Sequence, residues 1–420
     1  MEKWESSLEK LEMNCRFCNN FLENVFINLG KTPLANSYLS KEDHNKGEIF
    51  YPLRAFVCSK CFLVQLEEYE SPKNIFTEYA YMSSYSESML NHVKDFVEQT
   101  INRFHLDKNS QVIEIASNDG YLLQYYKNNN ISCFGIEPAL NVAKIAEEKG
   151  INTITKFFSF ETAKELAELD KKSEFLIAFN VLPHIPNLND FVKGLKIILK
   201  EKGVIVIQFS AYLLPFLQNI EFDTIYHEHF SFFSVYTLEK IFSKYGLTIF
   251  DVEEQSIHGG SMRLYLKHTT NDSIDVSSNV AEQIEKEIRY GINQLDCYKK
   301  FQKRVDGLKS NIWEFFLQSK IEKKTIIGYG AAAKATTMMN YCGIDKNLIP
   351  YTVDINPYKQ NKFLPGTQIP IYSTKKIFET KPDYVLILAW NLKEEIMKQM
   401  KDISQWGGKF VTFIPEVKVY

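Results

Sequence analysis

Residues 111–120 read Gln-Val-Ile-Glu-Ile-Ala-Ser-Asn-Asp-Gly, an apolar run that passes into a polar turn ending in glycine. Further apolar runs follow at SCFGIE, EFLIAF and GVIVIQF, separated by amphipathic segments of roughly 10 to 15 residues. This alternation is typical of buried parallel strands that are connected by crossover helices. The sequence therefore predicts an α/β domain in which residues 114–120 form a strand-to-helix turn.

The same alternation returns near the end of the chain. Residues 325–341 (TIIGYGAAAKATTMMNY), 383–391 (DYVLILAWN) and 408–413 (GKFVTF) again read as strands, a glycine turn and a helix. A charged helical segment over about 280–318 precedes them, and we expect it to connect two separate α/β domains that meet near residue 300. No repeat of about 20 to 50 residues is visible, which argues against a solenoid.

The composition narrows the functional classes. The chain has 420 residues, 45% of them hydrophobic and 24% charged, which suits about two to four folded domains. A net charge of −3 argues against a nucleic-acid-binding surface and favours a small partner. No apolar segment approaches the roughly 20 residues that cross a bilayer, and the N-terminus lacks the apolar core of a secretion signal. We therefore expect a cytoplasmic protein without a membrane partner.

Four of the seven cysteines form two CxxC pairs, Cys15/Cys18 and Cys58/Cys61. Two such pairs can supply the four tetrahedral thiolates that zinc prefers, and a closed shell of this kind is structural. Four unrelated buried cysteines and a redox CxxC are the alternatives, and the second is disfavoured because neither pair opens a βαβ unit. We expect a zinc-binding domain over residues 1–75, followed by α/β domains over 76–300 and 301–420.

The turn at residues 114–120 is a candidate cofactor site, because α/β proteins bind nucleotide-like ligands at the carboxyl ends of their strands. It is not a GxGxxG motif, and an ordinary strand-to-helix loop is the alternative. The next strand ends at Glu137, whose carboxylate could bind two ribose hydroxyls, and EFLIAF ends at Asn180, whose amide could hold an amino-acid-like tail. This set favours S-adenosylmethionine, with NAD as the alternative. The expected cofactor residues are Glu114, Ala116, Asn118, Gly120, Glu137 and Asn180.

A second candidate site lies at Tyr226-His227-Glu228-His229. In a strand the two histidines would share one face, whereas in a turn all four side chains could reach one pocket. Two imidazoles, a carboxylate and a phenol in four residues favour catalysis over purely structural hydrogen bonding or a metal site. His184 lies just beyond Asn180. Tyr79 and Tyr81 are candidates for a pocket wall, with core packing as the alternative.

The whole set of motifs resembles the sugar C-methyltransferases of deoxysugar biosynthesis, along nearly the whole chain. The matching motifs are CxxC, CxxC, YAYMSS, EIASNDG, GIEPA, NVLPHIP, EFDTIYHEHFSFFS, HGGSMR, GYGAAAK, VDINPYKQNKFLPGTQIPI and LAWN. The resemblance implies an N-terminal zinc-binding domain, a central Rossmann-like class I S-adenosylmethionine-dependent methyltransferase domain and a C-terminal Rossmann-like domain. It also implies a nucleotide-linked 4-keto deoxysugar substrate that is methylated on carbon three.

The resemblance also implies residue roles. His229 would be the base that removes the proton beside the ketone, and Tyr226 the phenol that faces the developing enolate. The other expected active-site groups are Glu228, His184, Tyr79 and Tyr81. Ala116 stands where many family members have glycine, and Gln208-Phe209-Ser210 replaces an acidic, proline-containing segment, which leaves the identity of the sugar open.

The glycine turn Gly328-Tyr329-Gly330 suits a pyrophosphate. Because the central domain already offers a cofactor site, we assign this turn to the nucleotide-sugar. Lys359 is a possible phosphate partner, although a solvated surface charge is an equal alternative. The expected substrate residues are His227, Arg263, Gly328, Tyr329, Gly330 and Lys334. Oxygen or nitrogen methylation of a related sugar and NAD-dependent oxidation remain alternatives. The oligomeric state is open, and a monomer is compatible with the sequence.

Overall fold

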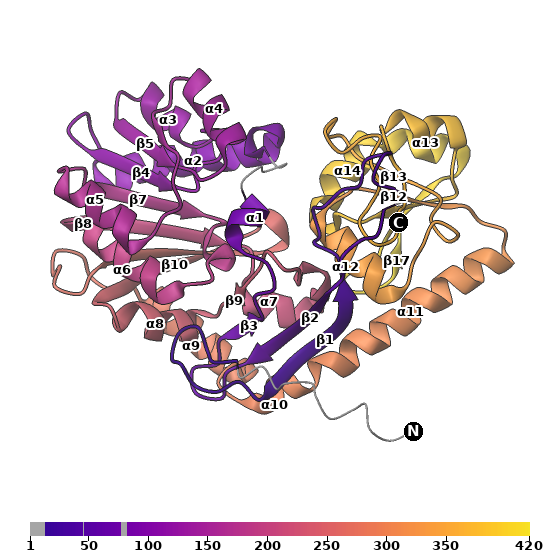
Figure 1. The fold of residues 1–420 in the computed structure, drawn as a ribbon, viewed down its shortest axis with the longest axis horizontal. Helices are drawn as coiled ribbons and strands as arrows, with labels where there is room; N and C mark the ends of the chain where they lie inside the picture. The colour runs from indigo at the N-terminus through magenta and orange to yellow at the C-terminus, as the bar shows by residue number, and fades with distance from the viewer. Residues whose placement is uncertain (1–12, 45, 77–81) are drawn as a thin grey trace.

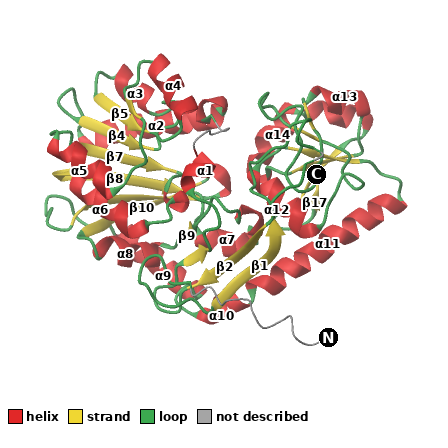
Figure 2. Cartoon of the chain, in the orientation of Figure 1, coloured by secondary structure: helices red, strands yellow, loops and turns green. Residues whose placement is uncertain are grey.

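The computed structural model describes residues 13–44, 46–76 and 82–420. Their strands form three sheets, each with its own helices, and the chain runs from one sheet to the next (Figures 1 and 2). None of the helices within these ranges is long and apolar enough to span a bilayer.

The N-terminal sheet has four antiparallel strands, and its last strand comes from a distant part of the chain. In sheet order the strands are β1 (Asn24–Thr32), β2 (Tyr51–Val57), β3 (Val64–Leu66) and β9 (Ser231–Phe232). Val64 pairs with Phe232, so the central part of the chain completes this sheet. The short helix α1 (Pro72–Phe76) follows β3.

The central sheet has seven strands, and six of them run in the same direction, while the strand next to one edge is antiparallel to both of its neighbours. In sheet order these are β10 (Leu247–Gln255), β11 (Ser261–His268), β8 (Leu199–Phe209), β7 (Ser173–Phe179), β4 (Gln111–Ile115), β5 (Ser132–Ile136) and β6 (Thr153–Ile154). The strand order reverses at β4, where α/β sheets form ligand crevices. The carboxyl ends of β4, β5 and β7 therefore lie together.

Helices accompany these strands as the amphipathic segments predict. They are α2 (Glu87–Phe104), α3 (Leu123–Asn128), α4 (Leu140–Glu148), α5 (Phe160–Glu168), α6 (Leu188–Ile198), α7 (Leu213–Asn219), α8 (Val235–Ser243) and α9 (Ser278–Tyr290). Short 3-10 helices accompany them in the described residues: η1 (Ser83–Tyr85), η2 (Leu182–His184), η3 (Phe222–Thr224) and η4 (Ile257–Gly259). A further one, η5 (Trp390–Leu392), lies in the C-terminal unit.

The expected helical connector is not one helix. It consists of α9, α10 (Leu295–Lys299) and α11 (Phe301–Ile321), and α9 ends at Gly291, which has a φ of 101°. Glycine adopts this left-handed conformation without a steric penalty, so it stops the helix. Figure 1 shows α11 running along one side of the molecule toward the C-terminal unit.

The C-terminal sheet has six strands, and only the last is antiparallel. In sheet order these are β14 (Ile371–Tyr372), β13 (Thr352–Val353), β12 (Ile326–Tyr329), β15 (Tyr384–Ile387), β16 (Lys409–Thr412) and β17 (Lys418–Val419). Its helices are α12 (Ala333–Cys342), α13 (Lys375–Thr380), α14 (Lys393–Gln399) and the 3-10 helix η6 (Lys401–Trp406). The strand order reverses at β12, as it does at β4 in the central sheet, so both sheets have the topology that forms a ligand crevice.

The N-terminal unit packs against both of the others. The apolar core of the central sheet includes Cys15, Cys58 and Cys61 of the N-terminal unit. On the other side, Phe26 of β1 packs with Phe301 of α11 at a ring distance of 4.8 Å. Leu39 forms a β-bridge to Phe363 of the C-terminal unit. The described part of the N-terminal unit therefore joins the two α/β units instead of standing apart from them.

Candidate active site

The four CxxC cysteines converge. Their sulfur atoms all lie within 4.8 Å of one another, and the pairs Cys15/Cys61 and Cys18/Cys58 are each 3.5 Å apart. The side-chain amide of Gln65 donates to the sulfur of Cys15, as outer-shell groups do around metal-bound thiolates. Four sulfurs in this arrangement fit a closed tetrahedral zinc site with no position for a substrate.

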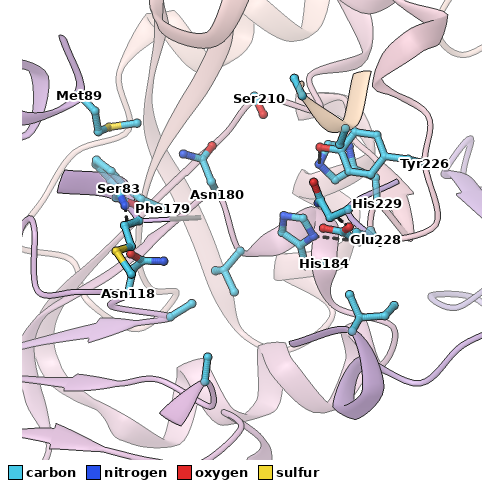
Figure 3. Close-up of a pocket in the computed structure, with 18 of the residues that line it drawn as sticks. Ser83, Met89, Asn118, Phe179, Asn180, His184, Ser210, Tyr226, Glu228 and His229 are labelled. Atoms are coloured by element: carbon cyan, nitrogen blue, oxygen red, sulfur yellow. Dashed lines mark hydrogen bonds between the residues drawn. The ribbon is translucent and has the colours of Figure 1, made fainter. Parts of the chain in front are cut away.

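A cavity of about 940 Å³ lies between the three units. Its wall includes Asn36 of the N-terminal unit, Asn118 and His229 of the central unit, and Lys334 and Asp354 of the C-terminal unit. Figure 3 shows Ser83 and Asn118 on one side of this space, Tyr226 and His229 on the other, and Asn180 between the two groups. Two sets of functional side chains therefore face the same volume.

The cofactor side is built from strand ends. Ala116 and Asn118 have φ values of 54° and 51°, so the backbone after β4 turns sharply. The Glu137 carboxylate accepts the backbone N–H groups of Asn118 and Ala139, each at 2.9 Å, and so ties the end of β5 to this turn. Asn180 lines the cavity, and its Oδ1 is buried without a hydrogen-bond partner among the residues that the structure describes. An unsatisfied acceptor at this position fits the ammonium group of an amino-acid-like tail.

Two expected cofactor residues do not reach the cavity. Glu114 lies inside β4, fully buried, and burial raises its pKa well above the ordinary value, with the carboxylates of Glu137 and Asp119 adding to the effect. Gly120 packs against Ala146 of α4 and against Ile151, from which an added Cβ would lie 3.3 and 3.1 Å away. Its φ of 74° and this close packing explain the glycine without any ligand contact.

The catalytic side is a turn, not a strand. Residues 226–229 connect η3 to β9, and three of their side chains, those of Tyr226, Glu228 and His229, line the cavity. The fourth, His227, lies behind the wall, where its Nε2 is 3.1 Å from the carbonyl oxygen of Pro52. The turn points His227 into the N-terminal unit, so it is not placed to bind a substrate in the cavity.

The hydrogen bonds of His229 define its tautomer. Its Nδ1 lies 2.9 Å from the carbonyl oxygen of Thr224, which can only accept, so Nδ1 carries the proton. Nε2 therefore holds the lone pair and accepts the hydroxyl of Tyr226 at 2.8 Å. Burial, followed by the neighbouring His184 and Lys334, holds the pKa of His229 well below its ordinary value. The imidazole is thus neutral at physiological pH and able to take up a proton.

His184 and Glu228 complete this wall. The two imidazole rings of His184 and His229 lie 4.9 Å apart, and Nδ1 of His184 donates to the backbone carbonyl of Glu228 at 2.8 Å. Burial lowers the pKa of His184 to about 4 and raises the pKa of Glu228 to about 7. Tyr79 and Tyr81 lie outside the described residues.

Sequence reasoning missed Asn36 of the N-terminal unit. Its side-chain amide donates to Oε1 of Glu228 at 2.6 Å, and its own oxygen accepts the hydroxyl of Tyr38 at 3.2 Å. The Tyr38 hydroxyl shares its single proton with a second acceptor, the carbonyl oxygen of Ala331 in the C-terminal glycine turn. No local motif marks Asn36, because the contact joins residues 192 positions apart.

The C-terminal side presents the expected glycine turn. Tyr329, Gly330, Lys334 and Lys359 all line the cavity, and Gly330 has a φ of 101°. Gly328 does not line it, because this glycine lies within β12, where a Cβ would sit 2.7 Å from Oγ1 of Thr352. The glycine at 328 is therefore needed for strand packing.

Arg263 is also absent from the cavity wall. It is buried, its guanidinium donates to Oε1 of Gln208 at 3.0 Å and to Glu253 at 3.1 Å, and it lies over the ring of Phe96. The guanidinium of Arg263, which we expected to bind a phosphate, is therefore already paired within the protein. Ser210, from the unusual segment after β8, does line the cavity.

Fold and site together define a methyltransferase of the α/β type that carries an N-terminal metal-binding unit. Three family models match the chain: "Putative zinc binding domain" over residues 15–76, "Methyltransferase domain" over 89–252 and "C-methyltransferase C-terminal domain" over 256–415. The chain is 33% identical over 405 residues to C-methyltransferase NovU of Streptomyces niveus, which covers 96% of both proteins. The chain belongs to the C-methyltransferase family. It is an S-adenosylmethionine-dependent methyltransferase with a zinc-binding N-terminal domain.

Solved structures align with part of the chain. The PH0226 protein of Pyrococcus horikoshii OT3 covers 48% of this chain and 99% of its own, with 14% identity and a TM-score of 0.36. Magnesium protoporphyrin IX methyltransferase of Synechocystis PCC 6803 covers 42% of this chain and 78% of its own, with 14% identity and a TM-score of 0.32.

Proposed function

We propose that the protein methylates carbon three of a nucleotide-linked 4-keto deoxysugar. The observation that carries this proposal is the pair of Tyr226 and a neutral His229 in a cavity that joins the cofactor turn to the C-terminal glycine turn. A carbon beside a ketone is a weak acid, so its methylation requires a base and a donor to the enolate oxygen. This pair supplies both groups.

The C-terminal turn would hold the nucleotide. Backbone amides at the start of α12 and the ammonium of Lys334 suit a pyrophosphate. Asp354 follows β13 and lines the same cavity, as expected of an acid that binds ribose hydroxyls. The sugar would then extend toward Glu228, whose carboxyl group is held by Asn36 and can accept from a hydroxyl or amine.

Proton removal follows from the tautomer of His229. As the ketone binds, the Tyr226 hydroxyl turns its proton from Nε2 of His229 to the ketone oxygen. The freed lone pair on Nε2 takes the proton from carbon three, and the electron pair of that C–H bond becomes the enolate. Tyr226 then stabilises the negative oxygen, an effect worth about 3 kcal/mol for a donor in a dry site.

When bound, S-adenosylmethionine would supply an electrophilic methyl group on a sulfonium, with a neutral thioether as the leaving group. Asn180 would orient the amino-acid tail and Glu137 the ribose. The imidazolium of His229 returns its proton to solvent after the transfer. The depressed pKa of His229 favours that return.

Product analysis tests this function. The purified protein is incubated with S-adenosylmethionine and a panel of thymidine-, uridine- and guanosine-diphosphate-linked 4-keto-6-deoxyhexoses, and the products are analysed by mass spectrometry and NMR. A C-methyl product at carbon three is expected, together with deuterium wash-in from solvent at that carbon without methyl transfer. A methyl ether or methylamine product without deuterium wash-in would contradict the proposal and indicate oxygen or nitrogen methylation. A change in absorbance at 340 nm with NAD would favour an oxidoreductase.

A further inference from the structure

The segment Asp223-Thr224-Ile225 connects the C-terminal unit to His229. The Trp390 indole N–H donates to Oδ2 of Asp223 at 2.8 Å, and the Thr337 hydroxyl donates to the carbonyl oxygen of Ile225 at 2.8 Å. Between them, the carbonyl oxygen of Thr224 accepts the proton on Nδ1 of His229. The Thr224 carbonyl, which sets the tautomer of His229, thus lies between two residues that are both bound by the C-terminal unit.

These contacts are buried and long-range. Trp390 lies 167 positions from Asp223, and Thr337 lies 112 positions from Ile225. Asp223 and Thr337 have 0% and 1% of their surface exposed. Because a buried polar group has no water to replace a lost partner, each contact strongly favours a single position of η3.

Trp390 itself has little freedom. The ammonium of Lys334 lies 4.2 Å from the centre of the indole ring, and Gly259 lies so close that an added Cβ would be 2.8 Å from Cζ3. The Asp223 carboxyl group therefore meets an indole that is fixed on two sides. Within the described part of the chain, Oδ1 of Asp223 is buried without a hydrogen-bond partner, and the indole of Trp390 is the side-chain donor that orients this carboxyl group.

We propose that Asp223 is a positioning residue, which acts with Trp390 and Thr337 to hold the Thr224 carbonyl so that the Nε2 lone pair of His229 faces the cavity. This inference rests on the proposed role of His229 as the base. Lys334, a proposed phosphate partner, lies on Trp390, so the nucleotide end of the site is connected to the base through Trp390, Asp223 and Thr224.

The test separates positioning from simple stabilisation. Asp223→Leu removes the acceptor, whereas Asp223→Asn keeps one for the indole. The double variant Trp390→Phe/Thr337→Val removes both donors and keeps an aromatic ring and a branched side chain at these positions, and it keeps the test decisive if Asp223→Leu fails to fold. The tautomer is measured by ¹⁵N NMR of histidine-labelled protein, with the His229 signals assigned by their loss in His229→Asn.

The wild type should show one tautomer at His229, with the proton on Nδ1, and the double variant should show a mixture. The kcat for the sugar nucleotide that is methylated should fall about 10- to 100-fold, as expected for a misplaced catalytic group, with the affinity for S-adenosylmethionine retained. Asp223→Asn should stay within about threefold of wild type, because a neutral acceptor keeps part of the bond.

A folded double variant with a wild-type tautomer, or with a wild-type kcat, would overturn the inference. A failure of the proposed base looks different. In that case His229→Asn would methylate normally, while the NMR spectra of the Asp223 variants would still decide whether Asp223 sets the tautomer.

Discussion

The hydroxyl of Tyr226 lies 2.8 Å from Nε2 of His229, and it is the donor because Nδ1 of the same imidazole is already committed to Thr224. The lone pair that could act as a base is therefore present but covered by the phenol that could stabilise an enolate. A substrate ketone that attracts the phenol proton would uncover this lone pair. Base and oxyanion donor would thus become active together.

Replacement of His229 by asparagine should reduce both methyl transfer and deuterium wash-in by about 10²- to 10⁴-fold, the usual contribution of a positioned base. Binding of S-adenosylmethionine, followed by calorimetry, should be unchanged. His227→Asn is the matched control, because His227 lies in the same turn but faces Pro52. Equal losses in the two variants, or near-normal rates in His229→Asn, would show that His229 is not the base.

Tyr226→Phe removes the hydroxyl alone. The enolate would lose its donor, so the wash-in rate, measured by NMR with no S-adenosylmethionine present, should fall by about 10²- to 10³-fold. The KM for the sugar nucleotide should change little, because the hydroxyl acts mainly on the developing charge. An unchanged wash-in rate would assign the stabilisation to another group.

Asn36→Leu should impair the enzyme although Asn36 comes from the zinc-binding unit. It leaves Oε1 of Glu228 without its donor, which costs about 1 to 3 kcal/mol for a buried acceptor. We expect kcat/KM for the sugar nucleotide to fall about tenfold, equivalent to roughly 1.4 kcal/mol. Tyr38→Phe, which removes only the hydroxyl that supports Asn36, should have a smaller effect. A larger loss in Tyr38→Phe would contradict this order of dependence.

Stability should depend on pH through Glu228, which faces Asn36 and Lys359. Burial raises the pKa of Glu228 from 4.5 to about 7, so between these values the unfolded chain releases a proton that the folded protein keeps. The free energy of unfolding therefore falls as pH rises through this window. Glu228→Gln cannot ionise and should be more stable than wild type at pH 8, by about 1 to 3 kcal/mol, with the difference shrinking toward pH 5. Denaturant unfolding at both pH values provides the measurement, and a difference that does not grow with pH would contradict the shift.

Cys15→Ser should lose zinc and stability together, because structural zinc contributes directly to folding. Elemental analysis and thermal unfolding give the two readouts. Cys297→Ser is the control, since this half-buried cysteine lies outside the cluster. A Cys15→Ser protein that stayed folded and kept its metal would exclude the proposed coordination.

The parts of the site that sequence could predict are those built locally. Ala116, Asn118, Glu137 and Asn180 follow directly from strand ends, because parallel strands bring their carboxyl ends to one edge of a sheet. The same rule could not tell that Glu114 stays inside its strand.

Long-range contacts explain the rest. His227 and Arg263 carry suitable chemistry, but the wall on which a side chain ends depends on tertiary packing, which placed one against Pro52 and the other against Gln208. Asn36 gave no signal because its partner lies in another unit. The segment around 280–318 was expected to be one connector, and its break at Gly291 depends on a single glycine inside an otherwise helical pattern.

The pairing of β9 with β3 places residues 231–232 in the zinc-binding sheet, two positions after His229. In a chimaera of two relatives with a single crossover near residue 76, the metal-binding unit would come from one parent and β9 from the other. The two would then have to pair within one sheet, next to His229. A recombination library that transplants residues 226–232 together with the first unit should yield more folded, active members than one that divides them.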